Sequence, residues 1–355
     1  MITQRRLRRR LALLLLLAAA VAGWYVPTGY LLVGPGQTMA LAQRITTGDE
    51  ALPPAAGDVL LLTVQARPAN PYQVVLAFGR LLGGRSIVHR RAVVPPRLDD
   101  HEYLALSRAQ MEESVGLAAV AALQAAGLAA NGRAGGARVV TPPMPPPWLP
   151  PTGRRAGSNP SPGSPLDLRP GDVITRANGA DIGFTGDLAP ALRDLGPGNR
   201  VQLEVERDGR RQPAEASLGW APPGGQEVML GTVLLSEDPV FDLSVPLAVD
   251  TGNVIGPSGG LALALAFYQS LGHEDVLRGR SVAASGYIRL DGTVGPVGGI
   301  GHKAAAAAAA GCDLLLVPPA NYAEARAAAP ELDIAATSSL AEALRFLRTG
   351  GLTLP

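Results

Sequence analysis

The sequence predicts an α+β protein with an N-terminal transmembrane helix, a small β-rich module and a C-terminal α+β domain. Three observations lead to this prediction. An apolar run follows a cluster of arginines, a segment rich in proline interrupts the chain at residues 141–165, and short strand patterns alternate with helical patterns after residue 220. The length of 355 residues is that of a chain with two or three domains.

Residues 1–34 are expected to form a basic tail and a membrane anchor. Five arginines precede Leu11, and no charged residue follows until Arg44. A run of about 20 apolar residues spans a bilayer, and flanking arginines stay on the cytoplasmic side. We therefore expect a single-pass protein of the cytoplasmic membrane, with its N-terminus in the cytoplasm and the bulk of the chain outside. A signal peptide cleaved after Ala20–Ala22 is the alternative.

Residues 35–140 are expected to form an α/β region outside the membrane. Gly57–Val64 and Gln73–Phe78 are short apolar runs typical of strands. Asp100–Ala126 has the periodicity of a long helix, and glycine follows it. Residues 141–165 are rich in proline, glycine and serine, which predicts an exposed linker or loop.

Residues 166–219 have the pattern of a compact module of short strands. Strands are expected near Val173–Ile174, at Val201–Glu206 and at Gln212–Leu218, with a short helix at Asp187–Leu195 and turns at Asn178-Gly179 and Asp208-Gly209. The stretch from Leu168 to Gly179 resembles the L-x-x-GD-x-I-x-x-x-(N/D)G pattern of bacterial PDZ domains. The resemblance implies a domain that binds peptide termini or loops by adding a strand to a sheet edge. Its carboxylate-binding loop should fall in the proline-rich segment, which has no glycine-hydrophobic-glycine signature, so a non-binding spacer is the alternative.

Composition excludes several classes of function. The net charge is +1 and the basic residues are scattered, so no nucleic-acid partner is expected. The single cysteine, Cys312, excludes an internal disulfide and lies in an apolar run typical of a buried strand. His101-Glu102 and His273-Glu274 lack the second histidine of a zinc-binding helix. We therefore expect neither a metal nor a cofactor.

Residues 220–355 are expected to form the third part of the chain. Strands are predicted at Val245–Val249, Ser281–Leu290, Thr293–Val297 and Asp313–Pro318, and helices at Leu261–Leu271, after Gly298-Gly299 and after a capping pair of Ser339 and Glu342.

Lys303 is the only lysine among 31 basic residues. Arginine stays protonated in proteins, whereas a buried lysine can lose its proton and act as a base. Ser258 lies in the turn Gly256–Gly260, at the start of the expected helix, where free N–H groups stabilise negative charge. A serine and a deprotonated lysine suffice for nucleophilic catalysis. Taken singly, Ser258 could be a helix cap and Lys303 a surface residue.

The C-terminal segments resemble the proteolytic domain of the Lon family of serine proteases. The matching stretches are Gly256-Pro257-Ser258-Gly259-Gly260, Ser285–Ile288, Gly292–Gly299, Lys303–Ala305, Ala310-Gly311 and Val317–Asn321. The resemblance implies that Ser258 is the nucleophile, that Lys303 is the general base and that Ser285 orients the lysine. It also implies that Gly256, Pro257 and Gly259 belong to the oxyanion loop. With the expected anchor and module, the chain resembles a bacterial, membrane-anchored, ATP-independent subfamily that acts on peptides or proteins, membrane or exported ones above all.

The chain departs from the Lon pattern at three positions. Ile255 stands where ATP-dependent members usually have an acidic residue, Gly259 replaces an alanine, and His302 stands where glutamate is frequent. No nucleotide is expected to bind, because a phosphate-binding loop needs a lysine and the only one lies elsewhere.

Two further functions fit the motifs. Gly256–Gly260 also matches the G-x-S-x-G pattern of α/β-hydrolases, with His302 as a base, although that fold needs the serine directly after a strand. A catalytically inactive scaffold that binds peptides is the other alternative. The sequence leaves open the substrate, the oligomeric state and the role of His302.

Overall fold

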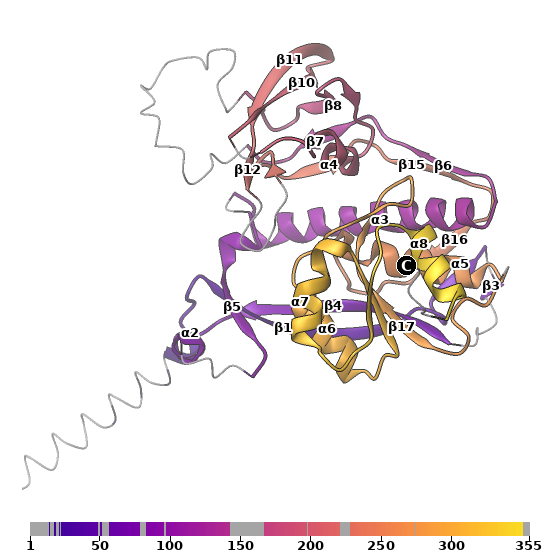
Figure 1. The fold of residues 1–355 in the computed structure, drawn as a ribbon. Helices are drawn as coiled ribbons and strands as arrows, with labels where there is room; N and C mark the ends of the chain where they lie inside the picture. The colour runs from indigo at the N-terminus through magenta and orange to yellow at the C-terminus, as the bar shows by residue number, and fades with distance from the viewer. Residues whose placement is uncertain are drawn as a thin grey trace, which may run out of the picture.

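The computed structural model describes residues 14, 18, 21, 23–48, 50–51, 57–78, 83–95, 97–142, 167–196, 198–220, 228–272 and 274–350. Within them, a six-stranded sheet in the order β21-β20-β17-β4-β1-β5 forms the centre of a larger domain (Figure 1). Its strands are β1 (Tyr30–Ala40), β4 (Asp58–Pro68), β5 (Ser86–His89), β17 (Ser281–Ala284), β20 (Leu314–Val317) and β21 (Ile334–Ala336). Strands β4, β17, β20 and β21 run parallel, and β1 and β5 are antiparallel to their neighbours.

Helices cover both faces of this sheet. On one face, α3 (Asp100–Ala125), α5 (Gly260–Ser270) and α8 (Leu340–Arg348) share a hydrophobic cluster, and α6 (Ile300–Ala309) and α7 (Tyr322–Ala328) share another on the opposite face. Successive strand residues point to opposite faces, so Leu61 belongs to the first cluster and Leu62 to the second. The fold is therefore mixed α/β, and the predicted α+β class is corrected: β17, β20 and β21 are parallel strands joined by the crossover helices α6 and α7.

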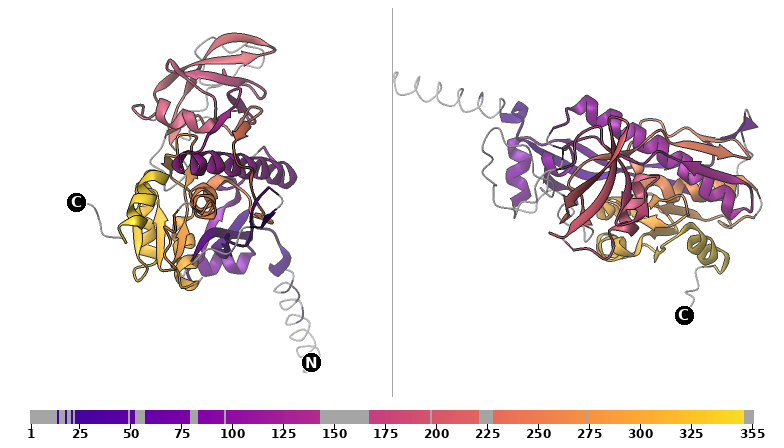
Figure 2. Two further views of the ribbon diagram at one scale, coloured as in Figure 1. Left: turned by 90° about the vertical axis from the view of Figure 1, so that its right-hand side faces the viewer. Right: turned by 90° about the horizontal axis from the view of Figure 1, so that it is seen from above.

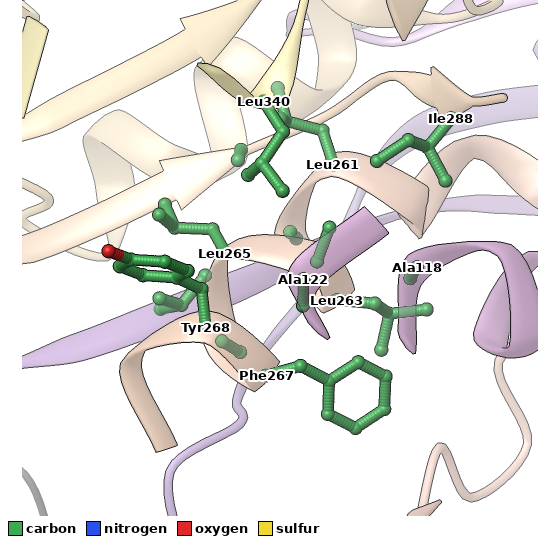
Figure 3. Packing of buried hydrophobic residues seen from close by; sticks show 14 of the residues in the cluster. Ala118, Ala122, Leu261, Leu263, Leu265, Phe267, Tyr268, Ile288 and Leu340 are labelled. Atoms are coloured by element: carbon green, nitrogen blue, oxygen red, sulfur yellow. The ribbon is translucent and has the colours of Figure 1, made fainter. Parts of the chain in front are cut away.

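Helix α5 is buried on all sides, as its apolar sequence predicts. Leu263 and Phe267 are fully buried, and Ala118 and Ala122 of α3 lie against them (Figure 3). The alanines let the two helices approach closely, so α3 covers α5 along its length. Burying side chains of this kind contributes about 1.5–3 kcal/mol each. This packing holds the first turn of α5 in one place.

A smaller domain is built on a second sheet, in the order β11-β10-β8-β7-β14, with β9 paired to β8. Its elements are β7 (Ala137–Val139), β8 (Val173–Ala177), β9 (Ala180–Asp181), η2 (Thr185–Asp187), α4 (Leu188–Ala191), β10 (Arg200–Arg207), β11 (Arg210–Ser217) and β14 (Leu234–Ser236). The two predicted turns are confirmed, since Asn178-Gly179 and Asp208-Gly209 have positive φ at both residues, as tight hairpin turns require.

The smaller domain is inserted into the larger one. Strand β6 (Ala130–Arg133) leads into it and β15 (Val240–Leu243) leads out, and the two pair as an antiparallel ribbon (Figures 1 and 2). The larger domain is thus assembled from both ends of the chain. The remaining elements are β2 (Ile45–Thr47), β3 (Glu50–Ala51), η1 (Arg90–Ala92), β12 (Gly219–Trp220), β13 (Val228–Met229), β16 (Leu247–Val249), η3 (Pro257–Gly259), β18 (Tyr287–Ile288), β19 (Val294–Gly295) and η4 (Pro319–Asn321).

The predicted transmembrane helix is wrong. The end of the apolar run, through Val33, belongs to strand β1, where Leu32 pairs with Arg67 on one side and Ile87 on the other. An apolar run without helical periodicity is equally compatible with a buried strand. Most of the run before Gly23 lies outside the described residues. In the part of the chain that is described, no helix has the length and apolar character needed to cross a bilayer, so the predicted location in the cytoplasmic membrane is corrected as well.

The apolar run Gln73–Phe78, predicted as a strand, lies in helix α2 (Pro71–Phe78). Asn70 and Gln73 form reciprocal side-chain to backbone hydrogen bonds of 3.0 and 3.1 Å, and Pro71 occupies the first helical position. These capping interactions start a helix and outweigh the apolar run that follows. The predicted strand Gly57–Val64 and helix Asp100–Ala126 are confirmed as β4 and α3. The predicted linker at 141–165 lies outside the described residues beyond residue 142.

Candidate active site

Ser258 lies in the single turn η3, directly before α5. Gly256 enters this turn with φ of +86°, a conformation that favours glycine, and its N–H donates to the carbonyl of Ser107 on α3 (2.8 Å). Pro257 follows, and its carbonyl accepts a hydrogen bond from the hydroxyl of Ser114, also on α3 (3.3 Å). The turn is therefore held against α3 from two sides.

The structure brings Ser258, Ser285 and Lys303 together. The Lys303 amine lies 2.6 Å from Ser258 Oγ and 3.0 Å from Ser285 Oγ. Lys303 comes from the second turn of α6, and Ser285 from the residue after β17. The exposed fraction is 3% for Lys303 and 1% for Ser285, whereas Ser258 is partly exposed. Three residues far apart in sequence thus meet at the end of the central sheet.

The hydrogen bonds around Ser285 define how the amine is oriented. Ser285 Oγ donates to the carbonyl of Ser258 (3.2 Å), which uses its only proton. Its oxygen must therefore accept a hydrogen bond from Lys303 Nζ. With one N–H directed at Ser285, a neutral amine can turn its lone pair to the hydroxyl of Ser258. The backbone N–H of Gly286 also donates to the Ser258 carbonyl (3.0 Å), so this segment supports both the lysine and the serine.

Burial lowers the pKa of the Lys303 amine to about 8. The cause is desolvation, which disfavours the charged form of an amine that has no carboxylate beside it. Ile255, in the loop before Ser258, adds no negative charge to this site. A substantial fraction of the amine is consequently neutral near pH 8.

The backbone of the turn around Ser258 limits which N–H groups are available to a ligand at this site. Among the predicted oxyanion-loop residues, Gly256 already donates to Ser107, and Pro257 has no N–H. Ser258 and Gly259 are left to supply donors to a developing oxyanion. Gly259 also has a packing role, because a Cβ at this position would lie 2.5 Å from Leu61 Cδ1. Leu61 occupies the space that an alanine side chain would need.

His302 lines the same cleft, but its side chain hydrogen-bonds to β5 and not to Ser258. Its Nε2 atom lies 2.8 Å from Ser86 Oγ on β5, so the ring connects α6 to the edge of the sheet. The hydrogen bond to Ser258 comes instead from Lys303, the next residue. This geometry does not favour His302 as the base of a G-x-S-x-G hydrolase.

Ser258 and Lys303 open into a cleft of about 2880 Å³, which β1, β4 and the loop before Ser258 line. Sites for small molecules are roughly 300–1,000 Å³. The cleft has room for a stretch of polypeptide. In the described residues, no group of three or more histidine, cysteine, aspartate or glutamate side chains is placed to hold a metal ion.

Sequence analysis missed the contribution of α3 to the site. The helix itself was predicted, but the carbonyl of Ser107 and the hydroxyl of Ser114 carry no motif. It also missed β14, which pairs with β7 and forms the edge of the smaller sheet. Leu230-Gly231-Thr232 precedes this strand, with φ of +69° at Gly231. The glycine between Leu230 and Thr232 is the signal in the sequence that precedes this strand.

Comparison with known proteins assigns both domains. Residues 158–218 match the PDZ domain family, and residues 238–345 match the Lon protease (S16) C-terminal proteolytic domain. An archaeal Lon protease from Halobacterium salinarum is 40% identical over 155 residues, which cover 42% of this chain and 21% of the relative. A "Probable periplasmic serine endoprotease DegP-like" from Pseudomonas savastanoi is 43% identical over 61 residues, or 17% of this chain and 13% of the relative.

A solved PDZ domain of an SdrC-like protein from Listeria monocytogenes also matches, with 19% identity. It covers 19% of this chain and 70% of its own, with a TM-score of 0.18. The chain spans about a fifth or less of the length of the curated relatives named above. In this chain, a PDZ domain is combined with the C-terminal proteolytic domain of Lon-type serine endopeptidases.

Proposed function

We propose that this chain is a serine endopeptidase that cleaves peptide bonds with Ser258 as nucleophile and Lys303 as general base. The observation that carries the proposal is the distance of 2.6 Å between Lys303 Nζ and Ser258 Oγ, at an amine that is 3% exposed. A buried amine with a pKa of about 8 supplies the neutral base that a serine hydroxyl needs.

In the first half of the reaction, Lys303 takes the proton of Ser258 while Oγ attacks the peptide carbonyl. The resulting oxyanion accepts hydrogen bonds from the N–H groups of Ser258 and Gly259, each donor accelerating the step roughly 10²–10³-fold. The ammonium of Lys303 then gives its proton to the leaving amine, and the C–N bond breaks. An ester between Ser258 and the substrate remains.

In the second half, water replaces the departed amine in the cleft. Neutral Lys303 takes a proton from the water as it attacks the ester, and returns this proton to Ser258 Oγ when the C–O bond breaks. Ser285 has the role of a positioning residue, because it accepts one N–H of Lys303 and keeps the lone pair on Ser258. Neither half of the reaction uses a metal or a nucleotide.

We propose further that the PDZ domain binds an extended peptide at the outer edge of β14. PDZ domains add a ligand strand to a sheet edge, and β14 ends the order of its sheet. The peptide or protein substrates of the larger domain are the natural source of such a ligand. If the chain were instead an inactive scaffold, it would bind such a peptide without cleaving it.

Cleavage of an unfolded protein by the purified full chain tests the proposal. We expect wild-type cleavage to be the same with and without ATP and Mg²⁺, and to fall to background in Ser258→Ala. Ser270→Ala, on the far end of the same helix, is the matched control and should retain wild-type cleavage. Cleavage that survives Ser258→Ala would refute the mechanism, and wild-type protein that binds peptide without cutting it would support the scaffold.

A further inference from the structure

Helix α3 contacts two separate parts of the molecule through adjacent residues. One is the turn that carries Ser258, and the other is the PDZ domain. On one side, Ser107 and Ser114 hold the backbone of Gly256 and Pro257. On the other side, Glu113, the residue before Ser114, accepts a hydrogen bond of 2.8 Å from Ser236 Oγ. The two contacts are thus only one residue apart on a rigid helix.

Ser236 belongs to β14, the edge strand of the PDZ domain. Its hydroxyl also accepts a hydrogen bond from the backbone N–H of Thr185 (3.0 Å), so it bridges η2 and α3. The hydroxyl has one proton, and Glu113 receives it. Glu113 is 6% exposed, which makes this an interdomain hydrogen bond shielded from water.

A second contact runs from the PDZ domain to the other side of the serine. Arg289 Nε donates to the carbonyl of Gly186 (3.1 Å), and a Cβ at Gly186 would lie 2.6 Å from the hydroxyl of Tyr287. Tyr287 follows Gly286, whose N–H holds the carbonyl of Ser258. The PDZ loop at Gly186 therefore rests on the strand that supports Ser258.

The burial of Glu113 makes its contact with Ser236 sensitive to rearrangement. Burial raises the pKa of Glu113, while the hydrogen bonds from Ser236 oppose that shift. Asp187, Tyr287 and Arg289 are the other ionisable groups at this interface. A buried carboxylate that loses its donor is left unsatisfied at a free-energy cost, so a displacement of β14 favours a compensating displacement of α3.

We propose that Glu113 is a positioning residue through which the edge strand of the PDZ domain sets the reactivity of Ser258. The proposal rests on the proposed function, since it describes the regulation of the same serine. A ligand strand added at β14 would shift Ser236, Glu113 and then the turn at Pro257. Coupling energies between sites in proteins typically correspond to a change of about 5- to 150-fold.

The rate at which a small fluorophosphonate labels Ser258 in the full chain tests this proposal. The probe reacts at the serine and is too small to reach the PDZ domain, so its rate reports the reactivity of Ser258 alone. We expect Ser236→Ala and Glu113→Gln each to lower the rate about tenfold, within the range for coupled sites. Ser236→Thr, which keeps the hydroxyl, should restore it. Glu112→Gln, an exposed neighbour on α3, is the matched control and should label at the wild-type rate.

A double variant separates coupling from a general loss of structure. Ser236 and Ser114 act on the same path. The double variant Ser236→Ala and Ser114→Ala should therefore lower the labelling rate by a smaller factor than the product of the two separate factors. Wild-type rates in Ser236→Ala, or strictly multiplicative effects in the double variant, would overturn the coupling and leave the dyad intact. Labelling that persists in Ser258→Ala would overturn the proposed function, and this inference with it. Thermal unfolding of each variant identifies any variant that fails to fold. If Glu113→Gln fails to fold, the comparison of Ser236→Ala with Ser236→Thr still decides the proposal.

Discussion

Two buried ionisable groups, one in each domain, respond in opposite ways to the loss of hydration on burial. In the PDZ domain, Asp172 is 1% exposed and forms a two-pronged ion pair with Arg207, at 2.6 and 2.7 Å. Hydrogen bonding to Asp172 raises the pKa of Arg207, so the guanidinium keeps its charge. In the proteolytic domain, Lys303 is almost as buried, and its hydrogen-bond partners among the described residues are the hydroxyls of Ser258 and Ser285. Its pKa falls to about 8.

The difference distinguishes a buried charge that stabilises the fold from a buried amine that can accept a proton. A buried charge that is paired contributes to the fold and does not exchange protons near neutral pH. A buried amine left without a counter-charge costs stability but becomes a base. The four predictions that follow test this contrast.

The largest effect is expected from Lys303→Arg. Arginine remains protonated, so it cannot accept the proton of Ser258. We expect kcat/KM for peptide cleavage to fall about 10³-fold or more, in the upper part of the range for general-base catalysis. Arg207→Lys should leave kcat/KM within about twofold of wild type, because that cation lies in the PDZ ion pair. Robust cleavage by Lys303→Arg would show that another group is the base.

Arg207→Ala tests the paired charge. It leaves the carboxylate of Asp172 buried without its partner, which costs about 3–5 kcal/mol in comparable pairs. We expect the free energy of unfolding of the PDZ domain, followed by denaturant titration, to fall by that amount. Arg200→Ala removes an exposed ion pair with Glu215, and should cost less than about 1 kcal/mol. Equal losses of free energy of unfolding in the two variants would show that the buried ion pair stabilises the domain no more than the exposed one.

The stability of the proteolytic domain should depend on pH through Lys303. Its folded pKa of about 8 lies below the ordinary value of about 10.4, so the unfolded chain binds more protons between these values. The free energy of unfolding should therefore rise from pH 8 to pH 10.4, by about 3 kcal/mol for this group. Below pH 8 the penalty is complete and constant.

Lys303→Met supplies the reference for that measurement. The stability difference between wild type and Lys303→Met should shift in favour of wild type as the pH rises through this window. Parallel curves would mean that the amine keeps its proton in the folded protein.

Ser285→Ala should have the smallest effect. Loss of its hydroxyl frees one N–H of Lys303 and removes a donor to the Ser258 carbonyl. We expect kcat to fall about tenfold with little change in KM, since Ser285 is buried behind the cleft and does not line it. Ser281→Ala, at the start of the strand β17 that precedes Ser285, is the control. A larger change in KM than in kcat would assign Ser285 to substrate binding.

The residues of the candidate site could be predicted because their chemistry is local and unusual. Lys303 stands alone among 31 basic residues, and Ser258 lies in a glycine-rich turn before an apolar helix. Helix α3 was predicted within a residue of its observed end. Its role in holding Ser258 was not, because the Ser107 carbonyl is a backbone group that every residue possesses.

Long-range pairing explains the other failures. The apolar residues Leu31–Val33 were interpreted as part of a membrane span, although their partners are strands that lie more than 30 residues later. Helix α2 was interpreted as a strand because its capping pair, Asn70 and Gln73, was overlooked. Residues 35–140 were expected to be a separate region, whereas β1 and β4 share a sheet with β17.

The pairing of β4 with β17 also bears on when the enzyme becomes active. Asp58 and Ser281 are neighbours in the sheet, and Lys303 enters the chain after both. During synthesis, the turn that carries Ser258 can pack against α3 well before Lys303 has left the ribosome. Contacts so distant in sequence form slowly. The Ser258–Lys303 pair therefore cannot form until α6 has been synthesised, so a nascent chain that ends within the 45 residues between them carries the serine without the amine.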